Sequence, residues 1–228
     1  MPLKKIGKGL LAFMACLLAY LVIAASWAQV SFNDAISKVP VASVNLSQRQ
    51  IDILLRVEDP NFYEHPGLSL AEGQGFATIS SAVASQVFLS DRKLDGVEGA
   101  FQALYRGVFR CCKRVDLGRD VMALVLNARL PKDRQLAQYV SEVYMGSHQG
   151  TAVIGLASAA ESYLSKPLEQ ASESEFIGLV AMIKAPNLYH PLKNPSLHHL
   201  RAARIQALIS GKCKPAGWFD TSYTQCDP

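Results

Sequence analysis

The residues best suited to chemistry in this chain stand together in one ten-residue segment. From Glu58 to Gly67 it reads Glu-Asp-Pro-Asn-Phe-Tyr-Glu-His-Pro-Gly, and so combines carboxylates, an imidazole and two aromatic rings. Aromatic neighbours can hold a carboxylate partly away from water, which raises its pKa. A carboxylate with a raised pKa can accept a proton near neutral pH. The segment therefore predicts a site of general base chemistry.

The order E-D-x-x-F-x-x-H-x-G in this segment resembles the first signature of the peptidoglycan glycosyltransferases (glycosyltransferase family 51). These membrane-anchored enzymes polymerise lipid II into glycan strands, and the leading glutamate of the signature is their catalytic base. The resemblance implies that Glu58 is the base here, with Asp59 and His65 shaping the site and contacting substrate. The alternative is an ordinary acidic helix end beside a structural histidine.

A second segment, from Gln74 to Ser81, is similar to the family's G-G-S-T-I-T-Q-Q stretch, which leaves a loop and enters a helix. Backbone N–H groups at a helix start attract anionic oxygens, so we expect the hydroxyls of Thr78 and Ser80 to contact the substrate's pyrophosphate. The alternative is that one of these hydroxyls only caps the helix. The family's glutamine pair is replaced by Ser81 and Ala82.

A third family signature, R-K-x-x-E, brings a second carboxylate near the reacting sugars. One alignment places Arg92 on its basic pair, with Asp95 and Glu98 nearby but off register. The other alignment places Arg119 where the glutamate should be. We expect these acids and Asp116 to be solvated surface carboxylates. A site without a second carboxylate must rely on positive groups to stabilise the leaving group, or lose activity.

A fourth segment, from Lys132 to Gly146, is similar to the family's K-D-x-I-L-E-x-Y-L-N-x-x-Y-x-G. Further motifs follow in family order, and the last, a double arginine, survives as Arg201 alone. The resemblance, which runs from Glu58 to Leu208, implies that Lys132, Arg92 and Arg201 stabilise phosphate charge. A charged helix start is the alternative explanation for Lys132.

The elements that must position these residues read as helices. Ser47 is a suitable N-cap for a helix that carries Glu58 at its C-terminal end, because Pro60 stops the helix. Apolar residues at helical spacing continue to residue 209, and in the fourth segment this pattern ends at Gly146. No sustained alternation of apolar and polar residues, which would indicate strands, appears. The class is mainly α. The resemblance implies a lysozyme-like, two-lobed glycosyltransferase domain behind an N-terminal transmembrane helix. The expected parts are 1–28, a cytoplasmic tail and anchor; 29–44, a connector; 45–210, the domain; and 211–228, a C-terminal tail.

The N-terminal region has the composition of a membrane anchor. Three lysines, at positions 4, 5 and 8, precede an uncharged apolar run from Gly9 to Ala28. A run of this length spans a bilayer, and the preceding lysines predict a cytoplasmic N-terminus. Together with the resemblance, this implies a single-pass protein of the bacterial inner membrane with its body on the periplasmic or outer face. The alternative is a cleaved signal peptide, since Ser26 and Ala28 are small residues at suitable positions.

The five cysteines fit an exported body. Cys213 and Cys226 can form a disulfide that closes a tail rich in turn residues, because disulfides persist in oxidising compartments. We expect Cys111 and Cys112 to be reduced thiols, since a bridge between neighbours is strained, and Cys16 to be a small apolar residue of the anchor. Cysteine and histidine spacing matches no zinc pattern, so no metal ligands are expected.

The function implied by the resemblance is inverting transfer that polymerises lipid II, with no required cofactor and an optional divalent cation. The expected partners are lipid II, the growing glycan strand, the membrane and other cell-wall synthesis proteins. Nucleic acid is not expected, because three of the four net positive charges precede the apolar run. Two alternatives stay open: a degenerate pseudoenzyme that binds lipid II or glycan, and a lysozyme-type lytic hydrolase.

Overall fold

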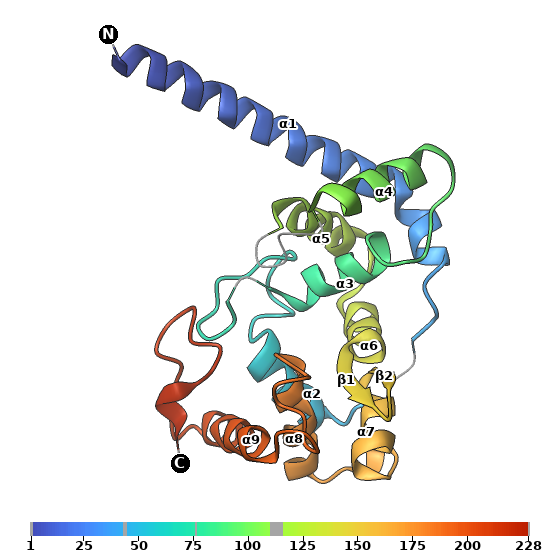
Figure 1. Ribbon diagram of the computed structural model, residues 1–228, viewed down its shortest axis with the longest axis vertical. Helices are drawn as coiled ribbons and strands as arrows, with labels where there is room; N and C mark the ends of the chain where they lie inside the picture. The colour runs from blue at the N-terminus through green and yellow to red at the C-terminus, as the bar shows by residue number, and fades with distance from the viewer. Residues whose placement is uncertain (1, 43–44, 76, 110–115, 228) are drawn as a thin grey trace.

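The computed structural model describes residues 2–42, 45–75, 77–109 and 116–227 (Figure 1). The described residues are mostly helical, which confirms the mainly α class. The α-helices are α1 (Pro2–Ser37), α2 (Gln48–Glu58), α3 (Ile79–Phe88), α4 (Gly96–Phe109), α5 (Leu117–Arg129), α6 (Lys132–Glu142), α7 (Leu156–Leu164), α8 (Glu173–Ile183) and α9 (Pro195–Ile209). The remaining elements are β1 (Tyr144–His148), β2 (Thr151–Ile154) and the short 3-10 helices η1 (Leu168–Gln170) and η2 (Thr224–Cys226).

Helix α1 joins the apolar N-terminal region to the body without a break. It runs through Ser37, so the first part of the predicted connector is helical. Its N-terminal half projects from the body, whereas Trp27, Ala28 and Phe32 are buried where the helix packs on α3 and α5 (Figure 1). Trp27 thus belongs to both the apolar helix and the core of the body. By length and composition, residues Gly7–Ser37 can cross a membrane.

Helix α2 begins and ends where the sequence predicts. Ser47 accepts a hydrogen bond from the Gln50 backbone N–H, and the Gln50 side chain accepts one from the Ser47 backbone N–H. This capping box satisfies two backbone donors at the helix start. Ile53, Leu54 and Val57 bury one face of the helix. Glu58 is the last helical residue, as expected.

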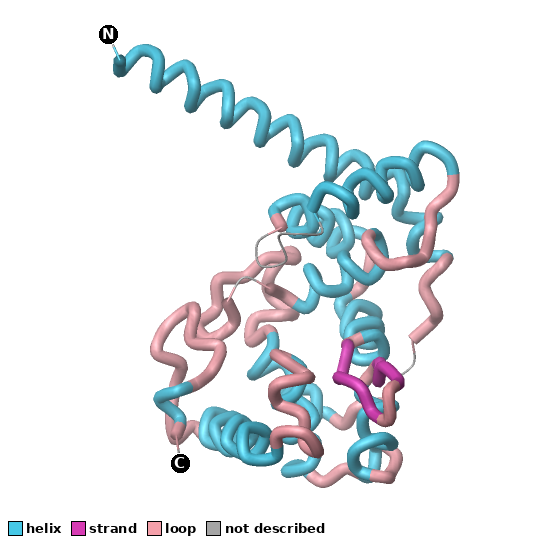
Figure 2. Tube along the Cα trace, in the orientation of Figure 1, coloured by secondary structure: helices cyan, strands magenta, loops and turns pink. Residues whose placement is uncertain are grey.

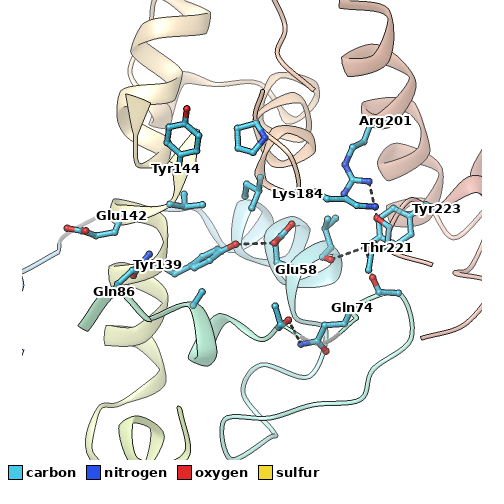
Figure 3. A pocket seen from close by; sticks show the side chains of 17 residues that line it. Glu58, Gln74, Gln86, Tyr139, Glu142, Tyr144, Lys184, Arg201, Thr221 and Tyr223 are labelled. Atoms are coloured by element: carbon cyan, nitrogen blue, oxygen red, sulfur yellow. Dashed lines mark hydrogen bonds between the residues drawn. The ribbon is translucent and has the colours of Figure 1, made fainter. Parts of the chain in front are cut away.

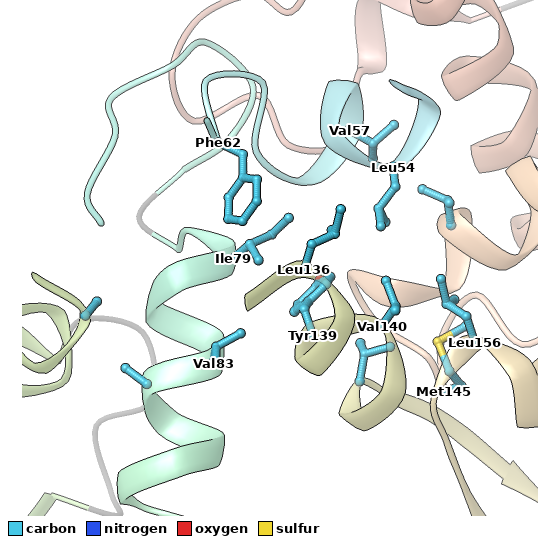
Figure 4. Close-up of a cluster of buried hydrophobic side chains, with 14 of the residues drawn as sticks. Leu54, Val57, Phe62, Ile79, Val83, Leu136, Tyr139, Val140, Met145 and Leu156 are labelled. Atoms are coloured by element: carbon cyan, nitrogen blue, oxygen red, sulfur yellow. The ribbon is translucent and has the colours of Figure 1, made fainter. Parts of the chain in front are cut away.

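One continuous core holds α2 against the helices around it. Leu54, Phe62, Ile79, Leu136 and Met145 come from five different segments and meet in this core (Figure 4). Helix α3 packs against both α5 and α6, and α8 packs against α2 and α9. The site residues therefore project from helices whose relative positions are fixed by close packing.

A short β-hairpin is the element that the sequence pattern did not predict (Figure 2). Helix α6 ends at Glu142 rather than at Gly146, and β1 then pairs antiparallel with β2. Gly146 has φ +91°, which a right-handed helix cannot contain. Gln149 and Gly150 form the two-residue turn, both with positive φ, as hairpin turns of this length require.

The C-terminal tail, residues 211–227, folds back onto the body. Cys213 and Cys226 form the disulfide that the sequence suggested. Cys226 and Tyr223 are buried, and η2 packs against α9. The prediction for Cys111 and Cys112 falls outside the described residues. Cys16 lies exposed on α1.

Candidate active site

Glu58 lies in a pocket of about 470 Å³ between the ends of several helices (Figure 3). Tyr139 and Glu142 of α6 line one side, and Arg201 of α9 lines the other. Glu58 is placed between them because Pro60 ends α2 at the pocket floor. The described lining residues are Val57, Glu58, Gly73, Gln74, Ala77, Ala82, Gln86, Tyr139, Glu142, Val143, Tyr144, Ile183, Lys184, Pro186, Arg201, Thr221 and Tyr223.

The Glu58 carboxylate is partly exposed to the pocket but densely surrounded by protein. One oxygen accepts a hydrogen bond from the Tyr139 hydroxyl at 3.0 Å. Burial raises the pKa of Glu58 above the ordinary glutamate value, although the charge of Arg201 and the Tyr139 hydrogen bond act in the opposite direction. Burial dominates because it penalises the charged form directly. The raised pKa agrees in direction with the sequence-based expectation, but Phe62 and Tyr63 are not among the described residues that line the pocket.

Two cationic side chains stand on the opposite side of the pocket. Arg201 is 2% exposed, and it donates from Nε to the Ala181 carbonyl and from Nη1 to the Thr221 carbonyl. Lys184 follows the last turn of α8, and burial together with the charge of Arg201 lowers its pKa to about 8. Both side chains place positive charge near Glu58, where an anionic leaving group could be stabilised.

Asp59 and His65 form a buried network directly behind Glu58. The Asp59 carboxylate is fully buried and accepts hydrogen bonds from His65 Nε2, Gln74 Nε2 and the Ile79 backbone N–H, all within 3.0 Å. His65 Nδ1 accepts from the Gly67 N–H at 2.9 Å, so Nε2 carries the ring proton and donates the hydrogen bond to Asp59. The network ties the loop after α2 to the start of α3 and thereby fixes the position of Glu58.

The hydroxyls of Thr78 and Ser80 are engaged within the protein. Thr78 caps α3, accepting from the Ser81 N–H, and its hydroxyl donates to the Gly67 carbonyl at 2.7 Å. Ser80 is fully buried and donates to the Gln135 side-chain oxygen at 2.7 Å. Neither residue is among the described residues that line the pocket. Thr78 therefore caps the helix, as the alternative states, whereas the Ser80 hydroxyl is buried against Gln135.

The remaining predicted cations also have protein partners. Arg92 donates to Glu142 at 2.6 Å, and this ion pair lies at the edge of the pocket. The Lys132 ammonium lies 4.5 Å from the centre of the Phe62 ring, and burial lowers its pKa to about 8. All eight predicted site residues lie in the described part of the chain, but only Glu58 and Arg201 line this pocket.

Tyr139, Glu142 and Lys184 are among the pocket residues that were not predicted as site residues. Tyr139 and Glu142 are three residues apart on α6, so they lie on one face of the helix. That spacing was a usable signal, because both belong to the fourth family-like segment. Lys184 begins a Lys-Ala-Pro motif, one of those that follow the fourth segment in family order.

The acids considered for a second catalytic carboxylate lie away from the pocket. Asp95 forms an ion pair with Lys38, and Asp116 is the N-cap of α5 and accepts from the Tyr105 hydroxyl. The Glu98 backbone carbonyl accepts from the Trp27 ring nitrogen at 3.1 Å. Among the described residues, the carboxylates that line the pocket are Glu58 and Glu142. Glu142 comes from the fourth segment and not from the third, where the family signature has its second carboxylate.

A helical body with a deeply set glutamate in a pocket is the architecture of the lysozyme-like glycosyltransferase domains. The family model described as Transglycosylase matches residues 27–209. The chain belongs to this family, which confirms the resemblance seen in its motifs.

Curated relatives agree with the family match. Penicillin-binding protein 1B of Escherichia coli (strain K12) is 33% identical over 150 residues, covering 64% of this chain and 17% of the relative. The Vibrio cholerae protein of the same name is 32% identical over 147 residues, covering 63% and 18%. Penicillin-binding protein 1B of Haemophilus influenzae is 30% identical over 166 residues, covering 72% and 20%. The chain thus spans about a fifth of the length of these relatives.

Proposed function

We propose that this chain is a peptidoglycan glycosyltransferase that polymerises lipid II into glycan strands with inversion at the anomeric carbon. The observation that carries the proposal is the Glu58 carboxylate, set in the pocket with a raised pKa and facing Arg201 and Lys184. Family membership supports the reaction class. In this proposal α1 anchors the protein in the inner membrane with its N-terminus in the cytoplasm. The body then lies at the bilayer surface, where it can bind the lipid-linked substrate.

Each group of the pocket has a role in this reaction. Glu58 takes the proton from a sugar hydroxyl of one lipid II molecule as that oxygen attacks the anomeric carbon of the growing strand. The bond between the anomeric carbon and the pyrophosphate oxygen breaks, and the lipid pyrophosphate leaves with the electron pair. Arg201 and Lys184 stabilise the negative charge that develops on this leaving group.

The proposal includes no required cofactor. Because Arg201 and Lys184 can supply the positive charge that a metal ion would otherwise bring, a divalent cation is an optional addition. Glycan strands and other cell-wall synthesis proteins are the proposed partners beyond lipid II. Chelation with EDTA should therefore reduce polymerisation without abolishing it, as measured by the yield of glycan polymer.

The test is incubation of the purified, detergent-solubilised protein with radiolabelled lipid II, beside the Glu58→Gln variant. Polymer from the wild type and none from the variant supports the proposal. Binding of lipid II without polymer would identify a pseudoenzyme, which the loss of the family's glutamine pair at Ser81 and Ala82 favours as the second candidate. Shortened strands from intact glycan would instead identify a lytic hydrolase.

A bell-shaped dependence of kcat/KM on pH is expected from the two shifted groups. Glu58 must be ionised, so the rate rises with pH through its raised pKa. Lys184 must stay protonated, so the rate falls as pH passes its pKa of about 8. The Lys184→Arg variant keeps its charge at higher pH and should move only the alkaline limb upward. An alkaline limb that stays in place would contradict this role for Lys184.

A further inference from the structure

The family match ends at residue 209, yet residues beyond it line the pocket. Thr221 and Tyr223 of the C-terminal tail stand on the same side of the pocket as Arg201 (Figure 3). The tail is therefore part of the site and not an appendage of the domain. Its contacts reach both the loop that follows Glu58 and the two pocket cations.

The first set of contacts joins the tail to the loop that contains Gly73 and Gly75 and leads into α3. The Gly73 and Gly75 N–H groups donate to the carbonyls of Gly217 and Trp218 at 3.1 and 3.0 Å. Gly73 has φ +77°, and a Cβ placed there would lie 2.6 Å from the Pro215 ring. The loop can therefore take this conformation against the tail only with glycine at position 73.

The second set of contacts starts from Tyr223, which is 2% exposed. Its hydroxyl lies 2.9 Å from the Val57 carbonyl and 3.4 Å from the Gly73 carbonyl. Val57 directly precedes Glu58 in α2. The buried ring thus ties the tail to the end of the helix that carries the proposed base.

The third set of contacts holds the cations. The Thr221 carbonyl accepts from Arg201 Nη1 at 3.0 Å, and the Arg201 guanidinium lies 5.5 Å from the centre of the Tyr223 ring. The Ser222 hydroxyl accepts from Lys184 Nζ at 2.6 Å. Both cations facing Glu58 are thus held by consecutive tail residues, and the Cys213–Cys226 disulfide closes the segment that carries them.

We infer that the disulfide-closed tail, residues 213–226, is a wall of the substrate pocket that positions Arg201 and Lys184 for the pyrophosphate of a lipid-linked sugar. Tyr223 and Ser222 are positioning residues in this scheme. The inference rests on the proposed function, since it assigns the anion to the lipid-linked substrate. It makes substrate binding dependent on the oxidation state of one disulfide outside the matched family domain.

The binding arm of the test uses short-chain lipid II and three tail variants: Cys213→Ser with Cys226→Ser, Tyr223→Phe, and Ser222→Ala. Each should weaken binding by up to about tenfold, because the cations are no longer held in place before the ligand arrives. KM should rise more than kcat falls. Cys16→Ser and Tyr163→Phe are the controls; the latter removes a tyrosine hydrogen bond to the Met145 carbonyl outside the pocket lining, and both should bind like the wild type.

A second arm needs no ligand and separates the two proposals. Reduction of the wild-type disulfide should accelerate hydrogen exchange at the Gly73 and Gly75 amides and at Arg201 Nε–H. If hydrogen exchange at these groups is unchanged after reduction, the inference is overturned. It is also overturned if exchange is faster but all three tail variants bind lipid II like the wild type. If the wild type binds no lipid II, the proposed function fails. Hydrogen exchange at Arg201 Nε–H, measured before and after reduction, then still shows whether the tail positions that side chain.

Discussion

Replacing Glu58 by Gln is expected to lower lipid II polymerisation by roughly 10²–10⁴-fold, the contribution typical of a general base. The amide keeps the size of the side chain and can still accept the hydrogen bond from Tyr139, but it cannot take a proton. Binding of lipid II should change little, because Arg201 and Lys184 remain. The measurement is the initial rate of polymer formation, with binding followed separately.

The same variant should be at least as stable as the wild type at neutral pH. The raised pKa means that folded Glu58 holds its proton more tightly than the unfolded chain does. Its contribution to stability is therefore greatest at low pH and is lost as pH rises through the folded pKa. The glutamine side chain of the variant carries no charge to desolvate, so the free energy of unfolding at pH 7 should not fall. A less stable variant with a proportional loss of activity would mean that Glu58 is structural.

Replacing Asp59 by Asn is expected to lower the free energy of unfolding by about 3 kcal/mol, within the range for a damaged buried network. Asp59 receives three donors from the protein, from His65, Gln74 and the Ile79 N–H. An amide can present only one oxygen to them, so its NH₂ group must face at least one other donor. Urea denaturation measures the loss, and polymerisation should fall as well because the loop beside Glu58 loosens.

The matched control is Asp52→Asn on α2, the helix that ends just before Asp59. Asp52 is exposed and accepts a single hydrogen bond from the Gln48 side chain at 2.9 Å, so its replacement should alter stability by less than about 0.5 kcal/mol. Equal effects of the two substitutions would contradict the network role of Asp59.

The parts of the fold that the sequence predicted depend on local signals. The start of α2 follows from Ser47 and Gln50, and its end from Pro60, because capping and proline act within a few residues. The position of Glu58 at the end of α2 was predictable for the same reason, since Pro60 stands two residues further along the chain. The hairpin after α6 was missed because its strands are short and irregular. Gly146, Gln149 and Gly150 were weak signs of it.

Most of the pocket lining beyond Glu58 and Arg201 was not predicted, because it depends on contacts between distant segments. Nothing near Arg92 in the chain indicates that Glu142 will neutralise it. Thr78 and Ser80 looked free in the sequence, but a helix cap and the side chain of Gln135 occupy their hydroxyls. The tail's contact with Arg201 and Lys184 likewise spans long chain separations, and only the two cysteines hinted that the tail is ordered.

The continuity of α1 has a consequence for how the body is oriented. Residues that project beyond the body and residues buried within it, such as Trp27 and Phe32, share one uninterrupted helix. Each residue of an α-helix advances the chain by 1.5 Å and turns it by about 100°. One amino acid inserted near Val22 would thus swing everything after it through more than a quarter turn relative to the N-terminal end. The number of residues in α1 therefore sets the rotation of the body about the helix axis, as well as its distance from the N-terminal end.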